Sequence, residues 1–527
     1  MKRSKLLNFS TAAYLLIVLF FIVNVVTLKQ YGMTYDERNY AMIGQMNVEY
    51  FHTLDRSQIH PLDDLMIYYG PAYHIVQQVF GLFAQAVFHL GYIDATHLFL
   101  VCTSTAMLLV VFFFARSLFR PSVGLCTVVL LMLFPHFIAH AHYNPKDLPE
   151  AEMVTISLYL FYRLYSTKRY VYAILAGAVY GFGLATVVSI LLAVPIFVAS
   201  YLSFLVFQER IYQRKDWRVY LLKDVLLFFV FAIVLMFTMV LSWPLLWSDP
   251  HIFVESIRLF RHHSWNGQVL YFGQTYLGSE IPWHYVLLSL FMATPLLPFC
   301  FFIVGLVRSG KQILHRKEMF PYAFILCWAA LPLIIFMLPG AVNYDGIRHF
   351  FMAIPPLMIL AGVGMDAVIR GLKNILHTRP VLLPTIFCII VVGWLVNESR
   401  QVHPYEGAYF NELVRLIIPA HIETVFEVEY WGASYREGVD WLNTHAAPNA
   451  VVCVPDGMHM VEMYPRRLDI LLHCGDDSTY VMYYTRGGPR KIPAPMLLNQ
   501  QSTQRVYTIS RQHSDYLYIV SISSVSQ

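Results

Sequence analysis

Long apolar runs recur along the whole chain and constrain its fold more than any other feature of the sequence. A helix that crosses a bilayer needs about 20 such residues. Eleven segments meet this description, roughly 11–29, 94–115, 121–139, 148–165, 171–187, 188–207, 222–243, 284–307, 320–339, 349–368 and 381–397. The chain is therefore predicted to be a mainly α-helical, polytopic membrane protein.

Composition and the positions of basic residues support this prediction. Only 13% of the 527 residues are charged and 57% are hydrophobic, whereas about a quarter are charged in soluble domains. Lysines and arginines gather in alternate loops, which predicts a cytoplasmic N-terminus and, with eleven spans, a C-terminus outside. No small-x-small cleavage site follows the first run, so it is predicted to be a retained helix. Because the basic residues are dispersed, no nucleic-acid partner is expected.

Two domains are predicted, a membrane domain over 1–397 and a polar extracytoplasmic α/β domain over 398–527. In the second, Ser434–Thr444 has a helical pattern, and Ala450–Val454, Tyr480–Tyr484, Val506–Ser510 and Tyr516–Ile522 have strand patterns. Cys453 and Cys474 could form a disulfide in an oxidising compartment. The other five cysteines lie in apolar runs, and none of the spacings suggests a metal site.

The first outer loop, about 30–93, is long and has an amphipathic segment. His74, Gln78, Gln85 and His89 recur on one face, while the other carries apolar residues, namely Val76, Phe80, Phe83 and Val87. This pattern favours a helix that lies in the membrane interface. A re-entrant segment or a twelfth span is the alternative.

Asp36 and Glu37 follow the first apolar run directly. Charge beside hydrocarbon is costly and usually functional. Adjacent carboxylates in a loop cannot face each other, so we expect one to act as a general base towards an acceptor hydroxyl and the other to support it. The alternative is that Asp36 caps a helix beginning near Glu37.

Two further outer loops carry candidate phosphate and acceptor residues. In the second, Asn144-Pro145-Lys146-Asp147, Asp147 would bind the acceptor or orient the base, and Lys146 would meet a phosphate. A helix cap with a snorkelling lysine is the alternative. In the fourth, Arg348 could donate two hydrogen bonds to a phosphate and stabilise its growing charge. Its alternative role is an interface arginine neutralised by Asp345.

Other candidates surround these groups. Tyr344, His349 and Arg261 are predicted on the donor side, while Asn144, His60 and Trp265 are predicted to contact or support the acceptor. Three histidines are the only metal candidates considered, His136, His140 and His142, with the first two at i,i+4. No third ligand is fixed by the sequence, and a divalent metal is not favoured.

The motifs together resemble the GT-C superfamily of membrane glycosyltransferases. The stretches MTYDERNY, HAHYNPKDLP, PWHYVLLSLFMATP, YDGIRHFFMAIPPL and YFNELV…YWGASYREGVDWLN resemble blocks of the bacterial relatives of dolichyl-phosphate-mannose protein mannosyltransferases, a group that includes the lipid A aminoarabinose transferase. The resemblance covers nearly the whole chain. The C-terminal region does not look like the β-trefoil of the eukaryotic protein mannosyltransferases. This difference weakens the expectation that the acceptor is a protein.

The resemblance implies a GT-C fold and an inverting transfer of a hexosyl or pentosyl group from a polyprenyl-phosphate carrier to an extracytoplasmic protein, lipid or glycan. The protein would then act in a bacterial inner membrane, among membrane lipids, and would serve the cell envelope. Asp36 would be the base, Glu37 its support and Asp147 the second-loop acid. Arg348, then Lys146, would bind the phosphate, and no cofactor would be required.

Two other classes of protein remain open at this stage. A transporter or flippase of a lipid-linked sugar would carry polar groups within its spans near the midplane, and the predicted spans are nearly free of charge. A non-catalytic protein that binds the polyprenyl lipid would have no need of Asp36. Replacing Asp36 by asparagine separates that class from an enzyme.

Overall fold

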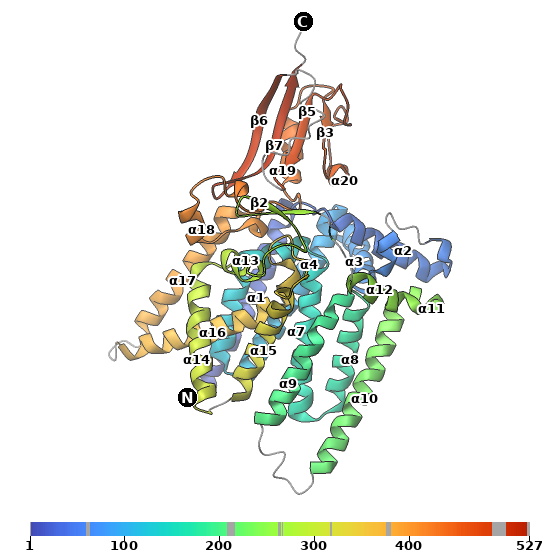
Figure 1. Cartoon of the computed structure of the whole chain (residues 1–527). Helices are drawn as coiled ribbons and strands as arrows, with labels where there is room; N and C mark the ends of the chain where they lie inside the picture. Colours follow the sequence, from blue (N-terminus) through green and yellow to red (C-terminus); the bar gives the residue numbers. More distant parts are fainter. Residues whose placement is uncertain are drawn as a thin grey trace.

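A helical bundle carries a β-sheet at one end (Figure 1). This computed structural model describes residues 2–58, 64–207, 217–261, 265, 267–316, 319–375, 381–486 and 502–523. We call the end of the bundle beneath the sheet the sheet end, and the opposite end, where the N-terminus lies, the far end. His60 lies outside the described residues.

Among the described residues, eight helices are long and apolar enough to cross a membrane. They are formed by α1 (Lys2–Thr27) with the 3-10 turn η1 (Leu28–Gln30), α4 (Tyr92–Leu118), the 3-10 turn η4 (Val188–Ala193) with α9 (Val194–Phe207), α10 (Trp217–Ser242), α14 (Leu296–Leu314), α15 (Met319–Phe336), the 3-10 turn η5 (Arg348–Ala353) with α16 (Ile354–Ile375), and α17 (Leu382–Val402). Between them they present apolar side chains both to one another and outwards. The chain is an integral membrane protein with the mainly α-helical architecture that the sequence predicts.

The predicted number of eleven spans is not confirmed, because several segments differ. The 121–139 segment is bent by 67° between α5 (Pro121–Met132) and α6 (Pro135–Tyr143), where a proline removes a helical N–H. Counting this pair as one span gives nine. The 15-residue α8 (Tyr170–Leu184) is about 22 Å long, shorter than the roughly 30 Å of hydrocarbon. The 284–307 segment breaks into α13 (Tyr285–Ala293) and α14.

The helix α7 (Asp147–Thr167) corrects a second expectation, that the spans are nearly free of charge. It has 21 residues but is not apolar enough to count among the eight. Glu150 and Glu152 are buried in its first two turns. The carboxylates lower its hydropathy, and both lie close to the sheet end, where α7 begins.

The first loop contains α2 (Glu37–Thr53), two short 3-10 turns, η2 (Arg56–Gln58) and η3 (Asp64–Tyr68), and α3 (Ala72–Phe88). His74 and Gln78 of α3 are buried, whereas Val76, Phe83 and Val87 are exposed. This helix therefore turns its polar face to the protein and its apolar face outwards, as a helix in a membrane interface does. It is not among the long apolar helices. The predicted amphipathic helix is confirmed, and its location in the membrane interface stays a prediction.

The C-terminal region contains a five-stranded sheet of order β4-β3-β5-β7-β6. The strands are β3 (Val451–Cys453), β4 (Leu471–Leu472), β5 (Tyr480–Tyr484), β6 (Ser502–Arg511) and β7 (Ser514–Ser523). Parallel pairing joins β3 to β4 and β5, and antiparallel pairing joins β7 to β5 and β6. The buried residues of α19 (Tyr435–His445) share a core with β5 and β7. The predicted helix and four strands are confirmed, β4 was too short to detect, and Cys453 and Cys474 form a disulfide.

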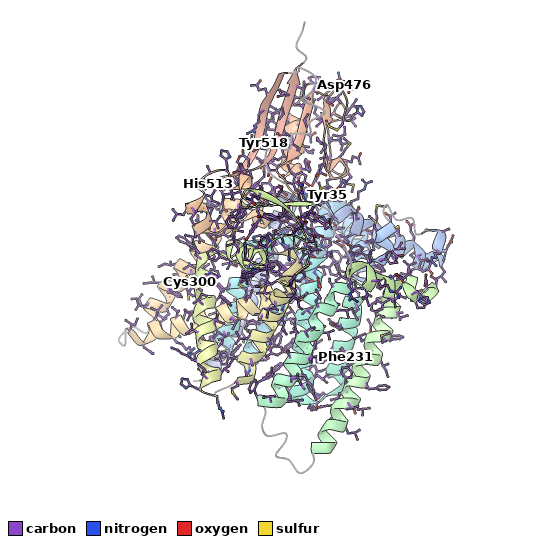
Figure 2. All side chains as sticks on the ribbon, viewed as in Figure 1. Tyr35, Phe231, Cys300, Asp476, His513 and Tyr518 are labelled. Atoms are coloured by element: carbon purple, nitrogen blue, oxygen red, sulfur yellow. A yellow bond between two sulfur atoms is a disulfide. The ribbon has the colours of Figure 1, made fainter. Side chains whose placement is uncertain are left out.

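The loop between α1 and α2 is held from both sides where the C-terminal region meets the bundle (Figure 2), and Tyr35 marks this junction. The Tyr35 N–H donates to the Trp431 carbonyl at 2.9 Å, and the Met33 N–H donates to the Tyr464 hydroxyl at 2.6 Å. A Cβ on Gly32 would lie 2.0 Å from the carbonyl oxygen of Ala433, so only glycine permits this close approach. The C-terminal region therefore fixes the loop that leads to Asp36 and Glu37.

Candidate active site

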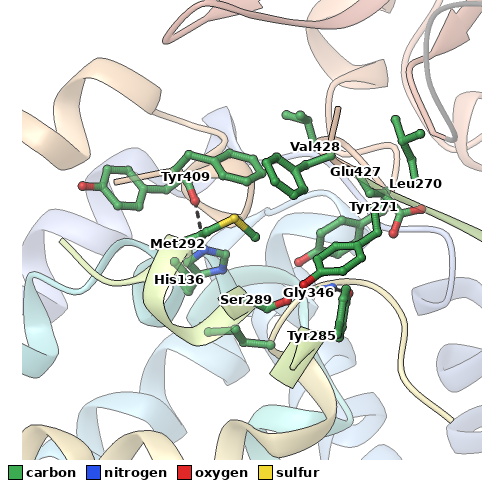
Figure 3. Close-up of a pocket in the computed structure, with 16 residues that line it drawn as sticks. His136, Leu270, Tyr271, Tyr285, Ser289, Met292, Gly346, Tyr409, Glu427 and Val428 are labelled. Atoms are coloured by element: carbon green, nitrogen blue, oxygen red, sulfur yellow. Dashed lines mark hydrogen bonds between the residues drawn. The ribbon is translucent and has the colours of Figure 1, made fainter. Parts of the chain in front are cut away.

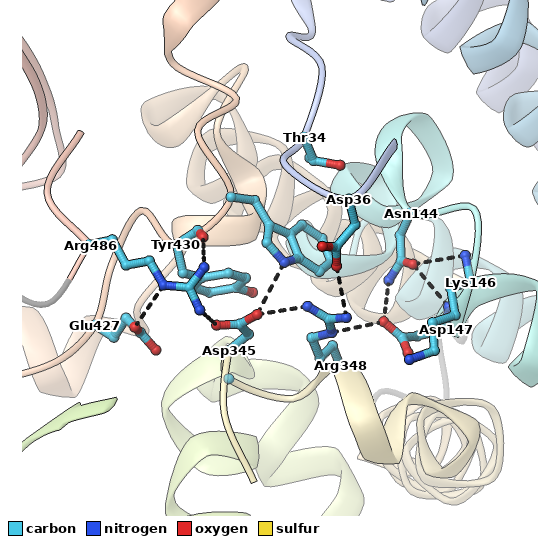
Figure 4. Close-up of polar contacts among 12 residues, drawn as sticks. Thr34, Asp36, Asn144, Lys146, Asp147, Asp345, Arg348, Glu427, Tyr430 and Arg486 are labelled. Atoms are coloured by element: carbon cyan, nitrogen blue, oxygen red, sulfur yellow. Dashed lines mark hydrogen bonds and ion pairs between the residues drawn. The ribbon is translucent and has the colours of Figure 1, made fainter. Parts of the chain in front are cut away.

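Arg348 lies at the centre of the candidate site, at the start of the 3-10 turn η5 (Arg348–Ala353). Each nitrogen of its guanidinium donates to a different carboxylate (Figure 4). Nε donates to Asp147 at 3.0 Å, Nη1 to Asp345 at 2.7 Å and Nη2 to Asp36 at 3.1 Å. The structure thus brings together acids from the first, second and fourth predicted outer loops.

The surroundings of Arg348 are aromatic and dry. The side chain is 4% exposed, with its guanidinium carbon 5.4 Å from the Tyr344 ring centroid and 5.0 Å from that of Trp431. A buried charge costs several kcal/mol unless it is paired and hydrogen-bonded. The three carboxylates supply that pairing. Arg348 is therefore a buried arginine that pairs with three acids, and not an interface arginine neutralised by Asp345 alone.

The three carboxylates are not held equally. Asp147 is 3% exposed and also accepts from Asn144 Nδ2 at 3.1 Å. Asp345 is 2% exposed and accepts from Trp431 Nε1 at 3.2 Å. Asp36 is 36% exposed, and among the described residues its carboxylate has one hydrogen-bonding partner, Arg348. Asp36 stands at the N-cap position of α2, as the alternative predicts, but its side chain makes no capping hydrogen bond and accepts from Arg348 instead.

Glu37 is oriented away from Arg348 and stabilises the loop. Its Oε1 accepts from the Thr34 N–H at 2.6 Å and from the Thr34 hydroxyl at 2.9 Å. Its Oε2 lies 2.8 Å from Nε2 of the fully buried His97 on α4. Glu37 is itself buried. This geometry suits the supporting role predicted for the second acid.

Asn144 organises the start of α7. Its Oδ1 accepts from the N–H groups of Lys146 and Asp147 at 3.1 and 2.9 Å. The Lys146 ammonium lies 5.6 Å from the Tyr69 ring centroid. Burial alone would lower the pKa of Lys146, but Tyr40, Tyr69 and Asp147 raise it well above its usual value. Lys146 is therefore a fixed cation beside the carboxylates.

The same cations control Asp147. Burial alone would raise the pKa of its carboxyl, but Arg348 and then Lys146 lower it to about 2. Asp147 therefore stays ionised at any physiological pH. Because it is nearly inaccessible and paired with Arg348, its position suits orienting that cation better than contacting an acceptor.

A stacked aromatic group borders the cluster. Trp265 lies parallel to Tyr344, with ring centroids 4.0 Å apart, and Tyr344 meets His349 edge-on at 4.3 Å. Arg261, by contrast, is exposed at the end of α12 (His251–Arg261), and no contact joins it to the cluster in the described part of the chain. Of the predicted donor-side residues, Arg261 alone is not brought into the site.

The three candidate metal ligands do not converge. His136 lies 3.3 Å from the carbonyl oxygen of Tyr409. His140 Nδ1 accepts a hydrogen bond from Asn144 Nδ2, and the His142 ring stacks on the Tyr31 ring. Within the described ranges, one group of three residues has metal-like spacing, the partly exposed set His421, Glu423 and Asp515 in the C-terminal region. None of the three candidate histidines belongs to this group.

Two residues of the site were missed at the sequence level, Trp431 and Arg486. Arg486 Nη2 donates to Asp345 Oδ1 at 3.0 Å, and its Nη1 donates to the Tyr430 carbonyl at 3.0 Å. Both come from the C-terminal region, which lies more than 80 residues beyond Asp345 in the sequence. Trp431 belonged to a block that carried the resemblance, but no local pattern marked either side chain as part of the site.

Two cavities differ in size and character. A cavity of about 40 Å³ lies behind the Asp345–Gly346 turn, lined by groups that include Tyr285, Glu427 and Tyr430 (Figure 3). It has room for only one or two waters. A cavity of about 720 Å³ lies among α7, α8, α9 and α10, with a lining that is almost wholly apolar.

Comparisons with known proteins agree with this architecture. The family model for dolichyl-phosphate-mannose-protein mannosyltransferases matches residues 79–243. No curated relative matches the sequence. Among solved structures, apo ArnT from Cupriavidus metallidurans has a TM-score of 0.51 at 15% identity, over 97% of this chain and 98% of that one.

Two structures of the Archaeoglobus fulgidus oligosaccharyltransferase are also similar. The complex of AglB with an inhibitory peptide and a dolichol-phosphate has a TM-score of 0.51 at 13% identity, over 90% of this chain and 69% of that one. The apo form has a TM-score of 0.50 at 13% identity over 86% of this chain, which spans 60% of its length. The fold is that of the GT-C membrane glycosyltransferases.

Proposed function

We propose that this protein is an inverting glycosyltransferase that moves a hexosyl or pentosyl group from a polyprenyl-phosphate carrier to an acceptor outside the cytoplasm. The observation that carries the proposal is the 3.1 Å contact between Arg348 and Asp36. It places a phosphate-binding cation beside the one carboxylate of the cluster that reaches solvent. The matched family, and the dolichol-phosphate bound to AglB, support this donor class.

Each nitrogen of Arg348 already donates to one carboxylate, and only Nη1 and Nη2 keep a second N–H. A phosphate that binds this cation also meets the three negative charges around it, so we expect it to displace one carboxylate. Asp147 and Asp345 are buried and each has a further donor. Asp36 is more exposed and has no second donor among the described residues. The donor phosphate would therefore take the Nη2 edge and free Asp36 to act as a base.

The chemical step follows from this exchange. Asp36 accepts the proton of the acceptor hydroxyl as its oxygen attacks the anomeric carbon. The bond from that carbon to the phosphate oxygen breaks, and the electron pair leaves with the polyprenyl monophosphate. Arg348 and Lys146 stabilise the charge that grows on this leaving group. The attack from the opposite face inverts the anomeric centre, and the proposal includes no metal ion.

In this proposal the carrier chain would lie in the large apolar cavity of the bundle. Its lining includes Leu184 and Met239, at the C-terminal ends of α8 and α10, and Tyr165 and Asp224, near the end of α7 and the start of α10. It therefore extends along the bundle between helices that begin or end near the site. An apolar chain in such a cavity is stabilised by about 25 cal/mol for each Å² removed from water.

Glu150 and Glu152 favour a second candidate, a transporter of the lipid-linked sugar, since ionisable groups buried in a span often mark a transport path. Their position argues against it. Glu150 and Glu152 lie three and five residues after Asp147, about 5 and 8 Å along α7. Transport sites lie near the bilayer midplane, whereas these carboxylates adjoin the charged cluster.

The test is transfer or release of sugar from a panel of synthetic polyprenyl-phosphate sugars by the purified protein. Turnover with one donor, reduced about 10²–10⁴-fold in Asp36→Asn, would support the assignment. Glu49→Gln is the matched control, because Glu49 is an exposed carboxylate of the same helix, and it should retain full activity. Equal turnover in Asp36→Asn and the wild type would eliminate Asp36 as the base.

A further inference from the structure

Arg486 connects the C-terminal sheet to the candidate site. It follows strand β5 by two residues and points into the carboxylate cluster from the sheet side (Figure 4). Its three nitrogens face Asp345, the Tyr430 carbonyl and Glu427, the last at 3.9 Å. The side chain is 23% exposed. Its contacts thus leave it poorly placed to bind a substrate itself.

Asp345 is shared between two arginines. Its Oδ1 accepts from Arg486 at 3.0 Å, and its Oδ2 accepts from Arg348 at 2.7 Å. Asp345 has a φ of +56° and Gly346 a φ of +68°, so the turn that leads to Arg348 uses two successive left-handed residues. Such a conformation is costly for a residue with a Cβ unless its surroundings hold it. The hydrogen bond from Arg486 supplies part of that constraint.

We propose that Arg486 is a positioning residue that acts through Asp345 to hold the guanidinium of Arg348 in the orientation that binds the donor phosphate. The proposal rests on the proposed function. Without Arg486, Asp345 would keep only Arg348 as a cationic partner in the described part of the chain. The Asp345 carboxylate would then be free to rotate with the guanidinium that it holds, and the Nη2 edge would turn away from Asp36.

A second contact supports the same assignment. The guanidinium carbon of Arg486 lies 5.5 Å from the Trp265 ring centroid, and Trp265 stacks on Tyr344, whose ring faces Arg348. Arg486 therefore reaches Arg348 by an ionic route through Asp345 and by an aromatic route through these rings. Both routes place a side chain of the C-terminal region behind the cation of the bundle.

The test measures the effect of R486Q in two backgrounds, the wild type and D345N, with farnesyl phosphate as the binding probe and with the donor found active in the panel. We expect R486Q to weaken farnesyl phosphate binding and to lower kcat/KM about 10-fold in the wild-type background. In the D345N background the loss should shrink to less than about twofold, because the ionic route through Asp345 is already broken and only the weaker aromatic route remains. R505Q, which removes an exposed arginine of the same sheet, should stay within twofold.

Other outcomes decide against the proposal. An equal loss in both backgrounds would show that Arg486 acts on the ligand directly or through its general field, and an unchanged R486Q would remove it from the site. If R486Q does not fold, R486K replaces it in the same cycle, since it keeps the charge but not the forked donors. A wild type that turns over no donor would refute the transferase proposal, while the farnesyl phosphate cycle would still decide the role of Arg486.

Discussion

The apolar segment Arg348–Ile375 has a cluster of ion pairs at each end, and the charges of the two clusters are reversed. At the sheet end, Arg348 gathers three carboxylates. Eighteen residues later, about 27 Å along the helix, Asp366 on α16 gathers Arg120 at 3.1 Å, Arg370 at 3.0 Å and the hydroxyl of Ser122 at 2.7 Å. The central group of the first cluster is a cation that pairs with three anions, and the central group of the second is an anion that pairs with two cations.

The clusters differ in what water can reach. Arg120 and Arg370 are 39% and 37% exposed, so solvent completes their hydration, and such pairs contribute about 0–1 kcal/mol each. At the sheet end the shared Arg348 is buried, and Asp36 alone is substantially exposed. The far cluster therefore fastens α16 to α5, whereas the sheet-end cluster leaves one carboxylate available for chemistry.

The strongest way to break this contrast is Arg348→Lys. Lysine keeps the charge but cannot direct three fixed N–H groups at three carboxylates, so we expect kcat/KM to fall about 10³-fold on the donor identified in the panel. Farnesyl phosphate binding should weaken in parallel. Activity within tenfold of the wild type would show that charge alone suffices and that the forked geometry is not needed.

The sheet-end cluster, but not the cluster around Asp366, could be predicted from the sequence, because Asp36, Asp147 and Arg348 each adjoin the end of an apolar run. Hydropathy and the bias of basic residues place such ends on the same side of a membrane. The sequence could not supply the distances or show which carboxylate is exposed, because these depend on how the loops pack. The positions of the loops predict that these residues lie on the same side of the membrane. Only the folded chain shows that the three carboxylates share one arginine.

The sequence failed where tertiary structure overrides local pattern. Arg486 follows a strand in a region with no visible link to the membrane domain, so no spacing pointed to Asp345. The bend at Pro135 and the carboxylates of α7 were hidden inside runs whose average hydropathy suggested plain spans. Averages over a window describe the lipid-facing surface well and the buried exceptions poorly.

Glu429 sharpens the comparison, because it is a buried sheet-end carboxylate that no cation pairs with among the described residues. Burial raises its pKa to about 7, against 4.5 ordinarily, although the N–H groups of Gly432 and Trp431 oppose the shift. Folding thus favours its protonated form, so stability is full below pH 4.5 and falls by about 3 kcal/mol as the pH rises to 7.

We therefore expect Glu429→Gln to flatten this pH dependence and to raise the melting temperature at pH 8 but not at pH 4.5. Thermal unfolding of both proteins across this range measures it. Parallel pH curves for the variant and the wild type would show that Glu429 is already ionised at neutral pH in the folded protein.

Lys146→Gln tests the second cation of the sheet end. The ammonium contacts the Tyr69 ring and makes no ion pair within 4.0 Å in the described ranges, so its loss leaves fewer carboxylates unpaired than the loss of Arg348. We expect KM for the donor to rise about 10-fold with a smaller change in kcat, measured by initial rates. A fall in kcat with unchanged KM would instead show that Lys146 interacts with the phosphate only in the transition state.

The smallest effect on activity is expected at the far end, from Asp366→Asn. Asparagine keeps an acceptor for Ser122 but loses the charge that holds Arg120 and Arg370. We expect kcat/KM within twofold of the wild type and a lower melting temperature, because Asp366 itself is 4% exposed and its pairing fastens two helices. A large loss of activity in a protein that melts normally would mean that the two ends are coupled through α16, and the division into a fastening cluster and a reactive cluster would then fail.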